Sequence, residues 1–196
     1  MIDIKLLEQL CLCNGISGDE GNVRNLIINE IKDCADDIKT DNLGNLIVFK
    51  KGKKSAKSKL MVSAHMDEVG LMVTDITSDG YLKFDEVGGI DRRVLPGKRV
   101  CVGRNGLNGV IGVKPIHLTN GDEKTAVPKM NDMYIDIGAE SREDALKYVN
   151  YGDGINFEGD FKINGKTVVT KALDDRFGCY VPVSYTHLRA HETLRY

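Results

Sequence analysis

The 196-residue chain has no tryptophan, and aromatic residues make up only 6% of it. So few aromatic side chains argue against a surface on which nucleic-acid bases stack. The chain also lacks an excess of one charge. It has 27 Lys and Arg residues and 29 Asp and Glu residues, which gives a net charge of −2. Such a chain has no bulk field to attract nucleic acid or an anionic membrane, so neither is expected as a partner. The lysine-rich segment 50–59 holds no aromatic residue, and we interpret it as a solvated connection, not a nucleic-acid arm.

Long hydrophobic runs and a cysteine framework are absent as well. No apolar run approaches the roughly 18 residues that a membrane-spanning helix needs. The N-terminal MIDIKLLEQL carries acidic residues where a secretory signal carries basic ones. The five cysteines are odd in number and scattered along the chain, which argues against a disulfide framework. We therefore expect a globular protein of the reducing cytoplasm.

The first part of the chain carries both helix and strand signals. Apolar residues at helical spacing predict one helix over 3–14 and a second one through Val23 and Ile27, with Ser17-Gly-Asp-Glu20 as its capping box. Asn42-Leu-Gly44 is a turn between two predicted strands. The apolar run 59–64 predicts a strand buried on both faces. Together these signals indicate an α/β layer.

After residue 70 the pattern changes to short β-type runs between glycine turns. One predicted helix, SREDALKYV with Ser141 as its N-cap, interrupts the series, and Asn164-Gly165 predicts a closing hairpin. Regular turn spacing of this kind predicts a small closed β-barrel or sandwich. Because α/β character resumes near Val168, we interpret the β-rich part as an insertion. The predicted α/β domain comprises residues 1–69 and 166–183, the insertion comprises 70–165, and a tail comprises 184–196.

Two short motifs carry residues suited to metal chemistry. In SAHMDE (63–68), the alternation of a strand places His65 and Asp67 on one face and Glu68 on the other. A carboxylate beside the ring can hold the second nitrogen of a metal-binding imidazole, although a lone histidine at a strand end is more often structural. In KALDDRFG (171–178), the two adjacent acids cannot face the same way on a regular strand. The alternative for this motif is a helix N-cap at Asp175 followed by a surface charge at Arg176.

Together, AHMDEVGLMV (64–73) and KALDDRFG (171–178) resemble the M42 family of metallo-aminopeptidases. These are the glutamyl or deblocking aminopeptidases, some of which are labelled endoglucanases. The stretches CNGISGDEGNVRNLI and PGKRVCVGRNGLNGVIGVKPIHL match the family too, so the resemblance extends over nearly the whole chain, to about residue 182. It implies a zinc-peptidase α/β sandwich domain interrupted by an inserted β-barrel dimerisation domain. It also implies large homo-oligomers built from dimers, often dodecamers.

The resemblance implies a site with two divalent ions, Zn²⁺ or Co²⁺, that activate a water for attack on the first bond of a peptide substrate. By motif match, His65 ligates one ion, Asp67 orients His65, and Asp174 bridges both ions. Asp175 occupies a position where the family has Asp or Asn, and we assign it no metal. A bridging carboxylate suits this chemistry because it offsets two close cations, which in turn lower the pKa of the shared water.

The chain departs from the family after this motif. A family member carries a general-base Glu, a ligand Glu, a ligand Asp and a ligand His further downstream, where this chain has SYTHLRAHETLRY (184–196). This tail resembles translated adapter sequence. His187 and His191 have the i, i+4 spacing of a helical zinc pair, which we interpret as chance. Glu68 is the only nearby acid that could serve as the base, and it is expected to face away from Asp67.

Three functions follow, in decreasing order of support. The first is a metal-dependent aminopeptidase represented by an N-terminal fragment, truncated and inactive. The second is an inactive assembly module, and the third is glycoside hydrolysis, which needs two carboxylates facing one sugar bond. The first predicts that ligating atoms of His65 and Asp174 lie roughly 3–4 Å apart, and that the Asp174–Asp175 peptide is cis. The interpretation of the β-rich part as an insertion predicts that residues 60–64 and 168–173 form neighbouring strands.

Overall fold

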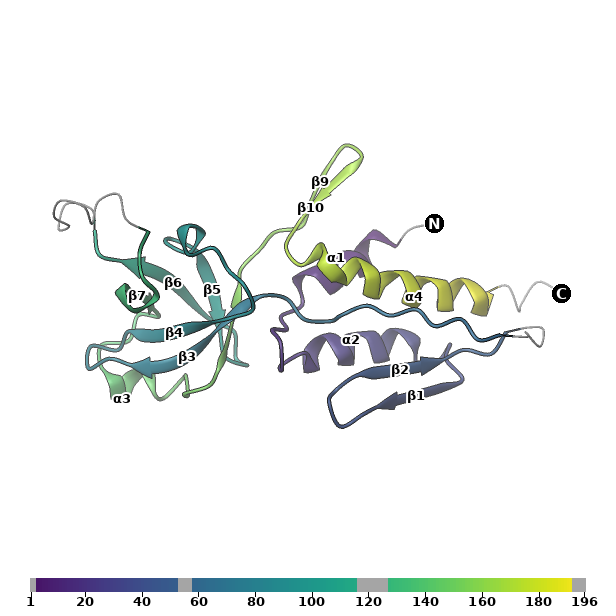
Figure 1. Cartoon of the computed structure of the whole chain (residues 1–196), viewed down its shortest axis with the longest axis horizontal. Helices are drawn as coiled ribbons and strands as arrows, with labels where there is room; N and C mark the ends of the chain where they lie inside the picture. Colours follow the sequence, from purple (N-terminus) through teal and green to yellow (C-terminus); the bar gives the residue numbers. More distant parts are fainter. Residues whose placement is uncertain (1–2, 53–57, 116–126, 192–196) are drawn as a thin grey trace. The chain divides into compact units, whose positions relative to one another are not determined.

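The computed structural model describes residues 3–52, 58–115 and 127–191, with side chains to residue 186. Its internal contacts divide the chain into two compact units. The α/β unit combines Met1–Glu68 with Gly159–Tyr196, and the barrel unit comprises Val69–Glu158. Figure 1 shows the helices α1, α2 and α4 in the first unit and the strands of the barrel in the second.

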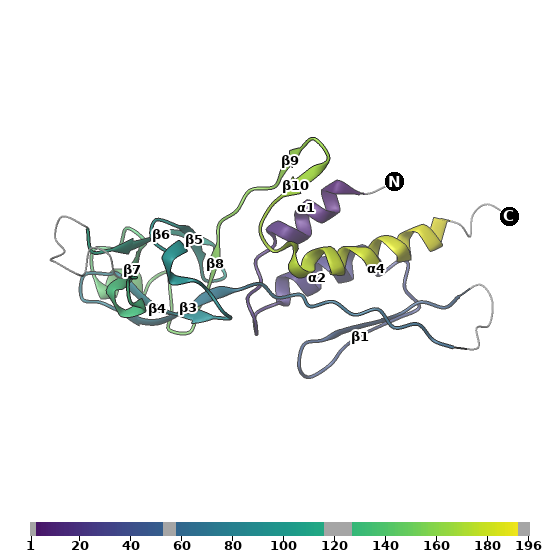
Figure 2. The same cartoon turned by 45° about the horizontal axis from the view of Figure 1, so that its top comes forward.

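Three helices form the core of the α/β unit. They are α1 (Ile4–Leu12), α2 (Gly21–Ile31) and α4 (Leu173–His191), and α4 contacts both of the others. Figure 2 shows the three from a second side. Both N-terminal helices are confirmed, and each buries the apolar face that its spacing predicts. The buried side chains they share with α4 are Leu6, Leu7, Leu10, Cys11, Val23, Ile27, Ile31, Cys179, Tyr180 and Val183.

Two antiparallel hairpins supply the strands of the described part of this unit. Strands β1 (Asp37–Thr40) and β2 (Leu46–Phe49) pair on either side of the predicted Asn42–Gly44 turn. Strands β9 (Lys162–Asn164) and β10 (Thr167–Val169) pair around Gly165, whose φ of +63° is a conformation that glycine adopts without steric cost. Both hairpins predicted from turn residues are therefore confirmed.

The buried strand predicted over residues 59–64 is wrong. This segment is an extended, unpaired stretch between β2 and the barrel unit (Figure 1), and Leu60 and Met61 are 90% and 87% exposed. The predicted pairing with residues 168–173 is also absent from the described residues, among which β9 is the one strand that pairs with β10. A strand forms only where a neighbour pairs with its backbone groups, and no described segment pairs with this one. An apolar sequence is therefore not sufficient for this segment to form a sheet strand.

The barrel unit is a closed barrel in which every strand pair is antiparallel. Its order is β3-β4-β7-β6-β5-β8. The strands are β3 (Gly70–Ile76), β4 (Leu82–Val87), β5 (Arg99–Val102), β6 (Leu107–Val113), β7 (Met133–Asp136) and β8 (Gly154–Phe157). Closure leaves these strands without an open edge. The predicted fold class, α/β interrupted by a β-barrel, is confirmed.

Apolar side chains from the strands and from the connections between them form the core of the barrel unit. The buried set is Leu71, Val73, Ile76, Leu82, Phe84, Leu95, Val100, Val102, Ile111, Met130, Met133, Ile135, Ala145, Val149 and Ile155. The short helices η1 (Arg92–Val94), η4 (Met130–Asp132) and α3 (Arg142–Ala145) lie in the connections. As predicted, Ser141 caps α3, and its hydroxyl accepts the N–H of Asp144.

The units divide after Glu68 and after Glu158, so the β9–β10 hairpin, which the predicted boundaries placed partly in the insertion, belongs to the α/β unit. Catalytic and dimerisation roles for the two units remain predictions. None of the helices in the described residues is both long and apolar enough to cross a membrane. The cellular location remains a prediction as well.

Candidate metal centre

His65 and Asp174 are 109 positions apart in the sequence and meet in the α/β unit. His65 lies in the extended segment before the barrel, and Asp174 lies at the start of α4. The Nε2 atom of His65 is 3.1 Å from Oδ1 of Asp174. The predicted approach of these two side chains is therefore present, although the segment that carries His65 is not part of a sheet.

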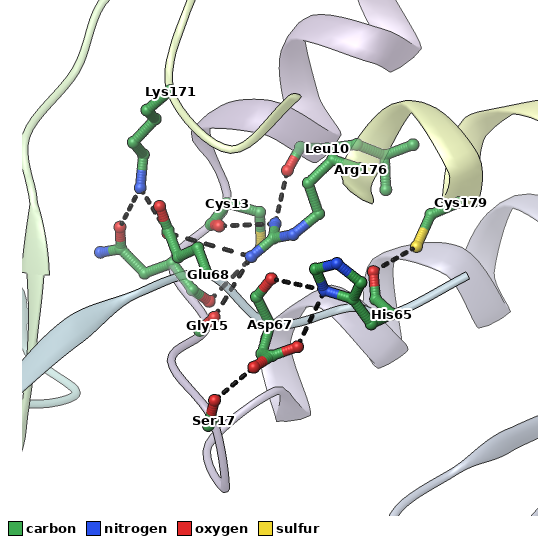
Figure 3. Close-up of polar contacts among 11 residues, drawn as sticks. Leu10, Cys13, Gly15, Ser17, His65, Asp67, Glu68, Lys171, Arg176 and Cys179 are labelled. Atoms are coloured by element: carbon green, nitrogen blue, oxygen red, sulfur yellow. Dashed lines mark hydrogen bonds and ion pairs between the residues drawn. The ribbon is translucent and has the colours of Figure 1, made fainter. Parts of the chain in front are cut away.

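The other ring nitrogen of His65 faces Asp67 (Figure 3). Its Nδ1 lies 3.0 Å from Oδ1 of Asp67 and 3.2 Å from the backbone oxygen of the same residue. Partial burial lowers the pKa of His65, but the hydrogen bonds to Asp174 and Asp67 and the negative charge of Asp67 together outweigh it, so the pKa is raised. The imidazole is thus held between two carboxylates that fix its orientation.

The Asp174–Asp175 peptide is cis, as predicted. The two carboxylates have different surroundings, since the Asp174 side chain is 96% exposed whereas Oδ1 of Asp175 accepts the N–H of Gly178 at 2.9 Å. Both residues have non-helical backbone angles. Asp175 therefore caps the following turns of α4 and leaves Asp174 free to face His65.

The interpretation of Arg176 as a surface charge is wrong. Its side chain is fully buried, and it donates hydrogen bonds to the carbonyl oxygens of Leu10 at 2.6 Å, Cys13 at 2.8 Å and Gly15 at 3.3 Å (Figure 3). Carbonyl groups at the end of a helix lack intrahelical partners, and the guanidinium group donates to carbonyl groups in the last turn of α1 and in the loop after it. Arg176 therefore ties the Asp174 segment to the loop after α1.

Glu68 is the buried partner of a lysine. Nζ of Lys171 is 2.6 Å from Oε1 of Glu68, and the two side chains are 14% and 7% exposed. Burial raises the pKa of Glu68, and the charge of Lys171 opposes that rise. Figure 3 shows Glu68 and Asp67 pointing apart, as strand alternation predicts. Because Glu68 is engaged by Lys171 and lies near Arg176, it does not face the space between His65 and Asp174.

A further residue at this site was not identified from the sequence. The hydroxyl of Ser17 donates a hydrogen bond to Oδ2 of Asp67 (Figure 3). That hydrogen bond is the main cause of the lowered pKa of Asp67. The capping box predicted at Ser17 and Glu20 is wrong, because α2 begins at Gly21 and Glu20 makes no side-chain capping bond. Gly18 has a left-handed backbone conformation, with φ of +88°, whereas a capping box requires helical residues directly after the N-cap.

The donor atoms present fit part of a metal site. The 3.1 Å between Nε2 of His65 and Oδ1 of Asp174 is close to the roughly 3.3 Å between neighbouring ligands on one tetrahedral zinc ion. Within the described part of the chain, no group of three or more His, Cys, Asp or Glu side chains could hold an ion. The side chains of His187 and His191 lie outside the described residues. The described site thus offers two donors, whereas zinc takes four ligands.

The comparisons with known proteins agree on one family. The sequence profile described as "M42 glutamyl aminopeptidase" matches residues 44–195, which include most of the predicted tail. A protein of Acetivibrio thermocellus named as an aminopeptidase is 49% identical over 178 residues, which is 91% of this chain and 51% of that protein.

Two solved structures show the same fold. The TET1 peptidase of Pyrococcus horikoshii, described as assembling into a tetrahedron or a large octahedral shell, is 45% identical with a TM-score of 0.84, over 96% of this chain and 57% of its own. A Thermotoga maritima protein described as an endoglucanase is 43% identical with a TM-score of 0.81, over 92% and 53%. The chain therefore spans about half the length of the relatives it matches.

Proposed function

Because the chain belongs to the M42 family of glutamyl aminopeptidases, we propose that its α/β unit carries part of the active site of a metal-dependent aminopeptidase. The observation that carries the proposal is the 3.1 Å approach of His65 and Asp174 across 109 positions of sequence. An exposed carboxylate and a fixed imidazole, brought together from distant segments, are a donor set suited to a divalent ion such as Zn²⁺ or Co²⁺.

Two residues of the site would bind the ions, and a third would orient one of these ligands. His65 would bind through Nε2, and Asp174, which has two exposed carboxylate oxygens, would bridge two ions. Asp67 accepts a hydrogen bond at Nδ1 of His65, which directs the lone pair of Nε2 toward Asp174. When bound, the ions would supply a water of lowered pKa and polarise the carbonyl of the scissile peptide bond.

The site as described is incomplete, and we propose that this polypeptide alone does not turn over substrate. Its two donors fall short of the ligands that two ions need, and a base must also take the proton of the water. Among the described acids near the site, Glu68 is bound to Lys171 and Asp175 caps α4. The described residues therefore do not supply the remaining ligands or a base that faces the site.

Peptides are the proposed substrate, and self-assembly into homo-oligomers based on dimers is proposed for the full-length protein. The Pyrococcus horikoshii neighbour supports assembly, since it is described as assembling into a tetrahedron or a large octahedral shell. An inactive assembly module is the second candidate, because the described strands of the barrel unit pair with one another into a closed barrel. Glycoside hydrolysis has less support: Asp175 is engaged by the N–H of Gly178, so Asp174 and Asp175 do not face one bond together.

Zinc titration of the metal-free 196-residue chain by calorimetry tests this proposal. We expect weak binding by the wild-type chain and no binding by His65→Ala or Asp174→Ala. Asp37→Ala, which removes an exposed carboxylate of the same unit paired with Lys39, is the matched control and should bind like the wild type. Equal binding by all four chains would place the ion elsewhere, with His187 and His191 as the next candidates. No binding by any chain would favour the assembly module.

A further inference from the structure

We propose that Ser17 is a positioning residue of the metal site, which acts on His65 through the carboxylate of Asp67. The inference rests on the proposed function, because the orientation of His65 matters only if His65 ligates an ion. It assigns a role to a loop residue whose sequence motif predicted a helix cap.

The hydrogen bonds form a chain across three segments. Ser17, in the loop between α1 and α2, donates to Oδ2 of Asp67. The other carboxylate oxygen, Oδ1, lies 3.0 Å from Nδ1 of His65, and Nε2 of that ring lies 3.1 Å from Asp174. Each oxygen of Asp67 thus has its own partner. Ser17 fixes the rotation of the carboxylate. The carboxylate, together with the backbone oxygen of Asp67 at 3.2 Å from the same nitrogen, favours the proton on Nδ1 of the ring.

The backbone holds Ser17 in this place. The carbonyl of Gly15 accepts the N–H of Glu68 at 2.9 Å, and Ile16 and Glu68 form a parallel bridge. The side chain of Ile16 is buried, and Arg176 donates to the same Gly15 carbonyl at 3.3 Å. Backbone contacts of its neighbours therefore hold Ser17 beside the segment of Asp67, without a contribution from the hydroxyl of Ser17.

The hydroxyl of Ser17 is also not needed to begin α2. That helix starts at Gly21, and the carboxylate of Glu20 accepts the N–H of Gly18 at 2.7 Å instead of closing a capping box. Removing the hydroxyl should therefore leave the helix start unchanged. The effect should appear at His65.

Two variants of equal shape isolate the hydroxyl group. Ser17→Thr keeps it and Ser17→Val replaces it with a methyl group, and the exposed position of Ser17 leaves room for either side chain. Ser63→Ala, which removes an exposed hydroxyl from the His65 segment, is the control. Far-UV circular dichroism shows whether each chain is folded. If Ser17→Val were unfolded, Ser17→Ala would replace it in every comparison.

The main readout is the tautomer of the metal-free His65 ring, from ¹⁵N-resolved NMR at alkaline pH, with the signal assigned by its loss in His65→Gln. We expect the Nδ1–H form to dominate in the wild type, Ser17→Thr and Ser63→Ala, and the Nε2–H form to gain in Ser17→Val. Zinc affinity should fall about tenfold in Ser17→Val alone, the low end of what the loss of an outer-shell partner costs.

The two readouts separate the two proposals. An unchanged tautomer in a folded Ser17→Val chain would overturn the role of Ser17, even if zinc binds at His65. A changed tautomer in a chain whose wild type binds no zinc would support the role of Ser17 in orienting the ring and contradict the metal site itself. A change of the same size in Ser63→Ala would also overturn the inference, because the effect would then not depend on the Ser17–Asp67 hydrogen bond.

Discussion

Replacing Lys171 by methionine should remove the counter-charge of a buried carboxylate. The side chains of Lys171 and Glu68 are 14% and 7% exposed, and their charged atoms are 2.6 Å apart. Loss of one partner from a buried ion pair typically costs about 3–5 kcal/mol, because the other charge stays buried without compensation. Arg176 remains 3.9 Å from the same carboxylate oxygen. We therefore expect a loss at the lower end of that range, about 3 kcal/mol, in the free energy of unfolding.

Urea unfolding followed by the helical circular dichroism signal measures this loss, since α1, α2 and α4 all lie in the α/β unit. Lys39→Met is the matched control. It breaks a pair with Asp37 at 3.0 Å whose side chains are 70% and 51% exposed, and such surface pairs contribute only about 0–1 kcal/mol. An equally small loss in both variants would refute the reasoning that Glu68 depends on Lys171.

The same variant should show a defined pH dependence. Burial already raises the pKa of Glu68 in the wild type, where Lys171 opposes the rise. A carboxyl group with a raised folded pKa binds its proton more tightly in the folded state, so its contribution to stability is fully present below the unfolded pKa and is lost as pH rises through the folded one. Lys171→Met should therefore approach wild-type stability near about pH 4 and differ most at neutral pH. The double variant Glu68→Gln/Lys171→Met should lack this dependence.

Three further outcomes are expected. Burial raises the pKa of Cys179 to about 11. At pH 8 the thiol of Cys179 should therefore react with a thiol reagent far more slowly than the thiol of Cys101, which is less buried. Equal reaction rates of the two cysteines, measured by mass spectrometry, would contradict this. Asp175→Ala removes the cap at the Gly178 N–H and should lower the free energy of unfolding by about 1 kcal/mol, whereas no change by urea unfolding would argue against the cap. Leu60→Ser, at a 90% exposed position, should change it by less than about 0.5 kcal/mol, and a loss of several kcal/mol would show that this segment is buried.

The features that depend on local sequence were predictable. Each of these features arises from residues that are close together in the sequence. They are the hairpins around Gly44 and Gly165, the cap at Ser141 and the apolar faces of α1 and α2. The closed barrel was predictable as a class from turn spacing, because short strands with one buried face must close or pair to cover their edges.

Features that depend on distant partners were predicted only in part. His65 and Asp174 were paired by resemblance to a family, which carries information about distant contacts that spacing does not. The burial of Arg176 was missed because the carbonyl groups it satisfies lie at the end of α1, far away in sequence. The strand at 59–64 was wrong because the same apolar run can form a strand or remain exposed, depending on whether a neighbouring strand is present.

The most direct test of the metal site is the addition of Co²⁺ to the metal-free chain while the ring resonances of its histidines are followed by NMR. A paramagnetic ion bound at Nε2 of His65 should shift and broaden the signals of that ring first, and Asp174→Ala should abolish the effect. Cobalt that broadens the other histidines but leaves His65 unchanged, or acts on His65 equally in Asp174→Ala, would contradict the assignment of His65 and Asp174 to one ion.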